Sequence, residues 1–431
     1  MPITFFWVFL LAMVVGVPIV FALAVGPLAG FILADKILFF KMLPQRLFGG
    51  ISQFPILAVP LFVLAGEVMN QSGITSNLVR FANVLVGHIR AGLAQTNIVS
   101  SMLFAGLSGS AVADTSAIGS ILIPAMEKDG YSREFAAAVT AASSVIGPII
   151  PPSIIMIIYA YVMKVSVAAL FLAGIIPGIL IGVGLMTVTG IIGKRRNYPK
   201  AERRASASEI WAAFKTAFLP LLTPFIILGG ILSGVVTPTE SAGAAVFYAL
   251  FLSLFIMRTV KFSDLPGMFY RTGLVSSSIL LIIGSASVFG WVATVSGVPQ
   301  EIGRLLFTMS DNPLYLLLLV NVLLLVSGMF LDAVPAILIL GPILGPALLT
   351  AGVDPLHFAI IMCINVTVGL ATPPMGLILF VASSIAQRGI EVITKEIWPF
   401  LMVHLLVIVL ITVFPALALL IPELTGFHTP R

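Results

Sequence analysis

Residues 104–124 read F-A-G-L-S-G-S-A-V-A-D-T-S-A-I-G-S-I-L-I-P, and the rest of the chain is best interpreted from this stretch. It is apolar enough for a membrane, yet Gly106 and Gly109 break it and Ser110 and Asp114 make it polar. A carboxylate within hydrocarbon costs roughly 2.5–3.5 kcal/mol on insertion scales, so a chain retains one where an ion, a water pocket or a partner offsets that cost. The stretch therefore indicates a functional site inside a membrane domain.

The composition of the chain is that of a membrane protein. Of its 431 residues, 59% are hydrophobic and only 9% are charged, and apolar runs of about 20 residues, long enough to cross a bilayer, recur from end to end. We therefore expect an all-α polytopic membrane protein. The single cysteine, Cys363, excludes a disulfide within the chain, and four scattered histidines suggest no transition-metal site. The net charge of +5 calls for no nucleic acid, because the basic excess lies in loops, where it orients the chain.

Two regions around the opening stretch are interrupted in the middle. Residues 92–107 and 112–126 are each short for a membrane span, and we interpret 92–126 as a re-entrant helical hairpin. The following apolar segment, 134–164, is broken by G-P-I-I-P-P-S at 147–153. Proline removes a backbone donor and clashes with the preceding turn, so this segment is predicted to unwind. Unwound backbone within a bilayer must face protein, water or an ion.

A second pair of interrupted regions follows in the C-terminal half. A hairpin over 313–349 is predicted around Gly328 and Asp332, and the segment 356–387 breaks at G-L-A-T-P-P-M-G, residues 369–376. Asp114 and Asp332 each lie ten residues before a proline, and Gly147 and Gly369 each lie four before a proline pair. The chain is therefore predicted to hold an internal repeat of two hairpins and two discontinuous helices.

The basic loops give the expected orientation. The loop 194–208 carries six Lys and Arg residues, the strongest cluster of positive charge in the chain, so we place it in the cytoplasm. The first hairpin then opens toward the cytoplasm and the second toward the opposite side, which makes the repeat inverted, as in secondary transporters. We expect scaffold helices over 1–90, a first transport repeat over 91–193, the basic loop with further scaffold helices over 194–311, a second transport repeat over 312–390, and a C-terminal helix over 391–431.

The sequence also predicts a helix cap and several uninterrupted membrane spans. We expect Thr237 or Thr239 to cap a helix with Glu240 in its first turn. We also expect spans over 3–33, 168–193, 219–235, 240–257, 273–297 and 397–421, with a short interfacial helix over 209–218.

The interrupted regions suit a hard cation. Two half-helices that meet at a break leave unpaired carbonyls at one end and unpaired N–H groups at the other. Carbonyls, hydroxyls and a carboxylate form an all-oxygen cage for a cation, while N–H groups favour an anionic substrate. No Lys or Arg lies in these core stretches to neutralise Asp114 or Asp332, so Na⁺ or H⁺ is the natural counter-charge.

The chain resembles the large membrane subunit, the DctM-like M subunit, of tripartite ATP-independent periplasmic (TRAP) transporters. The resemblance covers nearly the whole chain and is carried by G-L-S-G-S-A-V-A-D-T-S-A-I-G at 106–119, G-P-I-I-P-P-S at 147–153, T-P-T-E at 237–240 and G-L-A-T-P-P-M-G at 369–376. It implies an elevator-type sodium symporter of the bacterial inner membrane, with a transport domain that moves against a scaffold. It also implies a small carboxylate substrate such as a C4-dicarboxylate or sialic acid, a periplasmic (P-type) binding protein, and a small (Q-type) membrane subunit, which we expect as a separate chain.

The resemblance also implies roles for individual residues. One Na⁺ site would use Ser108, Gly147, Ile150 and Pro152, and another would use Gly328, Asp332, Thr372 and Met375, several of them through backbone carbonyls. Ser110, Asp114 and Ser166 would lie near the substrate path or its coupling to the ion.

Simpler interpretations stay open for several of these residues. Asp114 and Asp332 could cap helices without an ion, Ser166 could be an ordinary capping serine, and small residues often serve only close helix packing. An intramembrane aspartyl protease is an alternative function, because it also needs two acids, but it requires them side by side. An ion channel is another alternative, although the ring of charge that lines many channel filters is missing.

Overall fold

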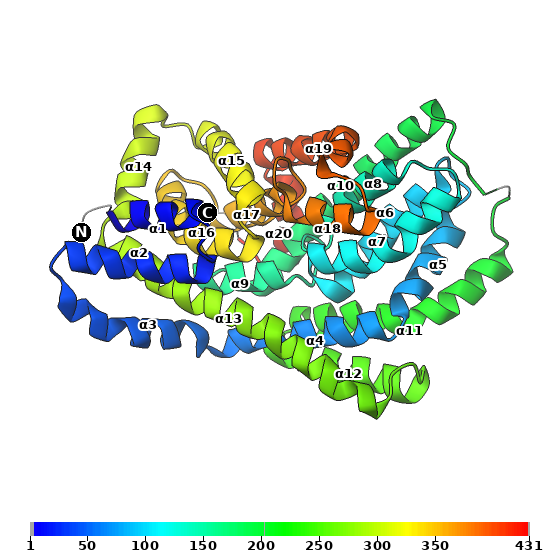
Figure 1. The fold of residues 1–431 in the computed structure, drawn as a ribbon, viewed down its shortest axis with the longest axis horizontal. Helices are drawn as coiled ribbons and strands as arrows, with labels where there is room; N and C mark the ends of the chain where they lie inside the picture. The colour runs from blue at the N-terminus through cyan, green and yellow to red at the C-terminus, as the bar shows by residue number, and fades with distance from the viewer. Residues whose placement is uncertain (1–3, 202, 430–431) are drawn as a thin grey trace.

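The protein is described by a computed structural model that covers residues 4–201 and 203–429. Every regular element in these ranges is a helix (Figure 1). Eight of the helices are long and apolar enough to cross a membrane by length and composition, and they include both arms of the second hairpin, α15 and α16. The prediction of an all-α, multi-pass membrane protein is confirmed at this level.

The N-terminal region is a pair of helices rather than the single span predicted over 3–33. The chain turns at Gly16, whose φ is +87°, and Pro18 starts the next helix, so α1 and α2 pack against each other. Gly26 allows this contact, since a Cβ there would lie 2.8 Å from the carbonyl oxygen of Phe5. The elements of this region are α1 (Thr4–Val14), α2 (Ile19–Leu33), η1 (Ile37–Lys41), α3 (Met42–Ile51), η2 (Phe54–Leu57), α4 (Ala58–Gln71) and α5 (Ile74–Val86).

The middle of the chain contributes long helices. The expected interfacial helix over 209–218 is wrong as a separate element, because it continues into the following span without a break. The predicted cap is confirmed: the Thr237 hydroxyl accepts from the Glu240 N–H, and the Glu240 carboxylate accepts from the Thr237 N–H at 2.7 Å. The elements are α10 (Val167–Arg195), α11 (Ala207–Leu232), α12 (Pro238–Phe251), η3 (Leu252–Ile256), η4 (Phe262–Asp264), α13 (Leu265–Val295) and α14 (Val298–Met309).

The interruptions predicted in the first repeat are present. Gly109 ends one arm of the hairpin in the left-handed conformation, at φ +57°, and the Ser110 hydroxyl caps the next arm by accepting from the Ala113 N–H. The proline-containing stretch 145–153 then separates two half-length helices, the second capped by Ser153. The elements are α6 (Gly92–Ser108), α7 (Ala111–Lys128), α8 (Arg133–Ser144) and α9 (Ile154–Met163).

The second repeat has the same interruptions. Its hairpin breaks at Leu331 and Asp332, and its discontinuous helix breaks over 370–376. The elements are α15 (Pro313–Phe330), α16 (Ala333–Thr350), α17 (Pro355–Gly369) and α18 (Leu377–Ala386), and the chain then ends in α19 (Ile390–Val413) and α20 (Ala416–Leu424). The predicted single C-terminal helix is therefore two helices, which Pro415 separates.

The two repeats align at a constant offset of 222 residues. With this offset Gly106 corresponds to Gly328 and Gly147 to Gly369, and the N-caps Ser110 and Ser132 correspond to the N-caps Asp332 and Asp354. The same offset relates the cis peptide bond Pro151-Pro152 to the cis bond Pro373-Pro374. The pairing of Asp114 with Asp332 is therefore wrong by four residues, because Asp332 is a cap whereas Asp114 lies inside the first turn of α7.

Both repeats contain a buried hydrogen bond between the hairpin and the discontinuous helix. Ser143 donates to Asn97 Oδ1 at 3.0 Å in the first repeat, and Asn365 donates to Asn321 Oδ1 at 2.9 Å in the second. The donors are equivalent under the same offset. Because an unpaired polar group at either buried position would be costly, these bonds favour one arrangement of hairpin and broken helix.

The two repeats interlock. The helix α9 of the first repeat packs on α16 of the second, and α18 of the second packs on α7 and α8 of the first. Glycines allow both contacts: a Cβ on Gly341 would lie 3.4 Å from Met163 Sδ, and a Cβ on Gly119 would lie 3.3 Å from Ile385. The interlocking brings all four interruptions into one region.

Candidate functional site

The break in the first hairpin lies against the break in the first discontinuous helix. A Cβ on Gly109 would lie 3.1 Å from the carbonyl oxygen of Pro152, and a Cβ on Gly147 would lie 3.5 Å from the carbonyl oxygen of Ser110. The Ser108 hydroxyl lies 3.4 Å from the Ser110 backbone nitrogen. Main-chain and hydroxyl oxygens of the two breaks are therefore close together here, and the contact is tight at Gly109. Carbonyl and hydroxyl oxygens are the kind of ligand that hard cations favour.

Ile150, which the resemblance places in the same sodium site, lies within the break of the discontinuous helix. Its side chain packs against Gly178 of α10. Whatever Ile150 contributes to an ion would therefore have to come from its backbone.

The second hairpin meets the second discontinuous helix in the same way. A Cβ on Gly369 would lie 2.5 Å from Gly328 Cα, and the Gly376 N–H donates to the Met329 carbonyl at 3.2 Å. Thr372 is buried and its hydroxyl donates to the Val368 carbonyl, whereas Met375 is exposed. The structure thus brings the predicted residues Gly328, Thr372 and Met375 to one junction beside Asp332.

A central cavity of about 390 Å³ lies between the repeats. Ser110 and Pro148 line it from the first repeat, Asp332 and Leu370 line it from the second, and Ser278 lines it from α13. Among its lining residues in the described ranges, Asp332 is the only charged one. Asp332 Oδ1 accepts from the Ala333 N–H at 2.7 Å, so the carboxylate caps α16 while it faces the cavity. The cavity is therefore lined by one acidic side chain and by the N-termini of four helices, α7, α9, α16 and α18.

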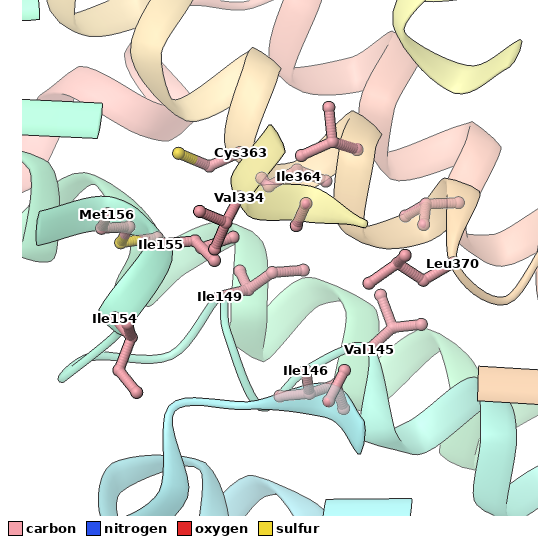
Figure 2. Close-up of a cluster of buried hydrophobic side chains, with 14 of the residues drawn as sticks. Val145, Ile146, Ile149, Ile154, Ile155, Met156, Val334, Cys363, Ile364 and Leu370 are labelled. Atoms are coloured by element: carbon pink, nitrogen blue, oxygen red, sulfur yellow. The ribbon is translucent and has the colours of Figure 1, made fainter. Parts of the chain in front are cut away.

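An apolar cluster holds the interruptions around the cavity in place. Figure 2 shows Val145 and Ile149 of the first interruption gathered with Val334 of α16 and Leu370 of the second interruption. All four side chains are buried. The cluster therefore joins the two discontinuous helices to the second hairpin.

A smaller cavity of about 190 Å³ continues from the central one. It shares the lining residues Ser110, Ile154, Val275 and Ile279, and extends to Asn70 and Glu67. At this end Arg271 of α13 donates to Glu67 of α4, with the Nε and Oε1 atoms 2.6 Å apart. The two cavities trace a route from Asp332 to this ion pair.

Asp114 is placed differently from Asp332. It is completely buried, and neither carboxylate oxygen has a hydrogen-bond partner among the described residues. The side chains of Ser101 and Ser144 face it from α6 and α8. Asp114 is therefore enclosed between α6 and α8 and does not line the cavity that Asp332 faces, so the two acids do not form the adjacent pair that an aspartyl protease requires.

Ser166 lies outside both cavities. Its hydroxyl accepts from the Ala169 N–H at 3.3 Å and so caps α10. The geometry of Ser166 is that of the ordinary capping serine, one of the two interpretations the sequence left open.

Within the described ranges no cluster of His, Cys, Asp and Glu side chains could hold a transition metal.

The contribution of α13 was not predicted. Its residues Val275, Ser278 and Ile279 form one wall of the cavity, and Arg271 lies at its end. The run Ser276-Ser277-Ser278 inside a predicted span was the available signal, because hydroxyls within a membrane helix can face a polar cavity.

Comparisons with known proteins agree on the family. The family described as the DctM component of the tripartite ATP-independent periplasmic transporter matches residues 6–417. The chain is 42% identical to the sialic acid TRAP transporter large permease protein SiaM of Vibrio cholerae, covering 95% of each protein. It is 39% identical to the C4-dicarboxylate TRAP transporter large permease protein DctM of Pseudomonas aeruginosa, covering 90% of each.

Among solved structures, the fold is similar to that of the YdaH transporter of Alcanivorax borkumensis. The TM-score is 0.60 at 17% identity, over 92% of this chain and 90% of the other. These two sequence relatives are named as transporter permease proteins. The chain therefore belongs to the DctM family, the large permease component of TRAP transporters.

Proposed function

We propose that the protein carries out sodium-coupled uptake of a small organic anion across the bacterial inner membrane. The observation that supports this is the central cavity, in which both sets of interrupted helices meet around Asp332. Helix N-termini favour an anion there, but the carboxylate repels one unless a cation binds as well. Coupled binding of Na⁺ and an anionic substrate satisfies both requirements.

Sodium would be held at the two junctions between hairpin and discontinuous helix. Ser108, Gly147, Ile150 and Pro152 would supply hydroxyl and carbonyl oxygens at the first junction. At the second, the oxygens would come from Gly328, Asp332, Thr372 and Met375. The bound ions would supply positive charge beside the substrate.

We propose an elevator-type mechanism in which the hairpins are re-entrant. The regions 91–193 and 312–390 would form the moving unit, and 1–90 and 194–311 the scaffold. The interlocked repeats support one moving unit, while α4 and α13 pack on it through α6, α9 and α16. With the loop 194–208 in the cytoplasm, the ion pair of Glu67 and Arg271 lies at the cytoplasmic end of the route.

Membership of this family supports the proposal of two further protein partners. A periplasmic substrate-binding protein would deliver the anion, and a small membrane subunit would complete the permease; that this subunit is a separate chain stays a prediction. The named relatives transport sialic acid and C4-dicarboxylates, so we propose a small carboxylate as substrate.

The test is uptake into proteoliposomes with candidate binding proteins and an imposed sodium gradient. Uptake is expected to require inward Na⁺ and to be lost in Asp332→Ala while that variant stays folded. Uptake that does not change when sodium is replaced by choline would contradict coupling, and passive flux without a binding protein would favour a channel. Full uptake by Asp332→Ala would remove this residue from the mechanism.

A further inference from the structure

A second large cavity, of about 750 Å³, lies apart from the central one and shares no lining residue with it. One of its walls belongs to α3 and α13, and the other to the end of α9 and to α16. We call it the outer vestibule. The polar and aromatic residues that line it are Arg46, Gln53, Tyr161, Lys164, Ser287, Trp291 and Thr294.

The charge of the outer vestibule is entirely positive. Arg46 and Lys164 line it, no Asp or Glu of the described residues does so, and neither cation forms an ion pair with a described carboxylate. The Arg46 guanidinium lies over the Trp291 ring, 5.2 Å from its centre. This contact orients the guanidinium without neutralising its charge.

The outer vestibule lies on the side of the membrane opposite the basic loop. The helix α10 has 29 residues, which is about 43 Å at 1.5 Å per residue and enough to cross the hydrocarbon. Lys164 precedes the start of α10, and the loop 194–208 follows its end. The tendency of cations to lie on the cytoplasmic side therefore does not account for Lys164.

We propose that the outer vestibule binds a small organic carboxylate before the anion reaches the central cavity. This proposal rests on the proposed function. Arg46 suits bidentate pairing with a carboxylate, and Lys164 adds a second positive charge. Gln53 and Thr294 can hydrogen-bond neutral polar groups of the same molecule. No Lys or Arg among the described residues lines the central cavity, so the outer vestibule would attract the anion and the central cavity would take part in its transport.

Binding can be followed through Trp291 itself. The chain has four tryptophans, and Trp7→Phe, Trp211→Phe and Trp398→Phe together leave Trp291 as the only one. This protein would be placed in nanodiscs of neutral lipid and titrated with succinate and with N-acetylneuraminate. A saturable fluorescence change with at least one of the two acids is expected, and it should weaken in high salt because exposed charges are screened.

Variants then assign the signal to the outer vestibule. Arg46→Gln and Lys164→Gln should each weaken the apparent affinity about tenfold, the usual scale for one charge-assisted contact. Lys41→Gln removes a cation of the same N-terminal region that does not line the cavity, and should leave the affinity unchanged. In uptake assays Arg46→Gln and Lys164→Gln should raise KM for the substrate-loaded binding protein and leave the maximal rate near that of the unmodified protein.

Several outcomes would overturn the proposal. One is normal sodium-driven uptake with no saturable Trp291 response to either acid. Another is a response that needs phosphatidylglycerol in the nanodisc and does not change with either acid, since it would assign the cations to lipid headgroups.

Conversely, an Asp332→Ala protein that has lost uptake but still shows the response would support the outer vestibule as an independent site. A protein that binds the acids here but never couples uptake to sodium would contradict only the proposed function.

Discussion

Ser110 and Asp332 occupy equivalent positions in the two repeats, and both face the same cavity. Each is the N-cap of the second arm of its hairpin, so the N-termini of α7 and α16 converge on this space. One repeat supplies a hydroxyl there and the other a carboxylate. Two positive helix ends beside one acidic side chain support the proposed binding of a cation together with an anionic substrate, and both repeats are needed for this arrangement.

The charge of Asp332 can be separated from its role as a cap. Asparagine caps helices about as well as aspartate, so Asp332→Asn should keep the unfolding temperature within a few degrees. It removes the charge that we propose draws sodium into the cavity. We expect the sodium concentration for half-maximal uptake to rise at least about tenfold, as for the loss of one charged ligand. Uptake measured against graded sodium checks this, and an unchanged sodium dependence would mean that Asp332 serves only as a cap.

The contact of Gly328 with Gly369 should tolerate no side chain. A Cβ on Gly369 would lie 2.5 Å from Gly328 Cα, where backbone would have to move. We expect Gly369→Ala to destabilise the protein by about 1–3 kcal/mol and to abolish sodium-driven uptake. Thermal unfolding in detergent and uptake in proteoliposomes measure the two effects.

A second glycine gives the matched control. Nothing lies within 4 Å of a Cβ built on Gly243, inside α12. Gly243→Ala should therefore keep full uptake and add about 0.5–1 kcal/mol of stability, since alanine loses less backbone entropy in a helix. If Gly369→Ala behaved like Gly243→Ala, the close packing of hairpin and broken helix would not matter for transport.

Glycine and paired prolines act locally, and they mark three of the four interruptions in the sequence; the fourth, at Leu331 and Asp332, has neither, because Gly328 lies inside α15. Gly109 ends a helix, and the proline pairs Pro151-Pro152 and Pro373-Pro374 interrupt two others. Single prolines such as Pro177 do not have this effect, since Pro177 lies inside α10. The pairing of Asp114 with Asp332 failed for the opposite reason: two acids at the same distance from a proline gain different roles when one is a cap and the other lies within the first turn. Only the positions of the helix ends separate the two.

The turn within 3–33 and the role of α13 also depend on tertiary structure. A continuous apolar stretch fits one long helix or two short ones, and the contact of Gly26 with Phe5 decides between them. Val275 and Ile279 look like ordinary membrane residues in the sequence. They face a cavity only because the hairpins meet α13 there.

The T-P-T-E stretch should contribute to stability and not to transport. Thr237 and Glu240 satisfy each other's backbone N–H groups at the start of α12, and Glu240 is exposed. Thr237→Ala removes one of these bonds and should cost about 1 kcal/mol with uptake retained. Thr187→Ala, which removes an exposed hydroxyl from the interior of α10, should change stability by less than about 0.5 kcal/mol. Paired thermal melts and uptake assays measure both variants, and loss of uptake in a stably folded Thr237→Ala protein would give this cap a part in transport.

Asp114 should couple sodium binding to the hairpin without contacting the cavity. Its carboxylate is buried with no hydrogen-bond partner in the described part of the chain, beside the hydroxyls of Ser101 and Ser144. Burying such a group is costly, so Asp114→Asn should raise the unfolding temperature in sodium-free buffer. The same change should reduce both sodium-driven uptake and the stabilisation that added sodium gives the unmodified protein, because ligand binding to the folded state raises its stability. Asp129→Asn, in the exposed turn after α7, should alter none of the three quantities. If Asp114→Asn kept both uptake and the sodium-induced rise in unfolding temperature, the buried acid would be a packing feature of the first repeat, and coupling would depend on Asp332 and the two junctions alone.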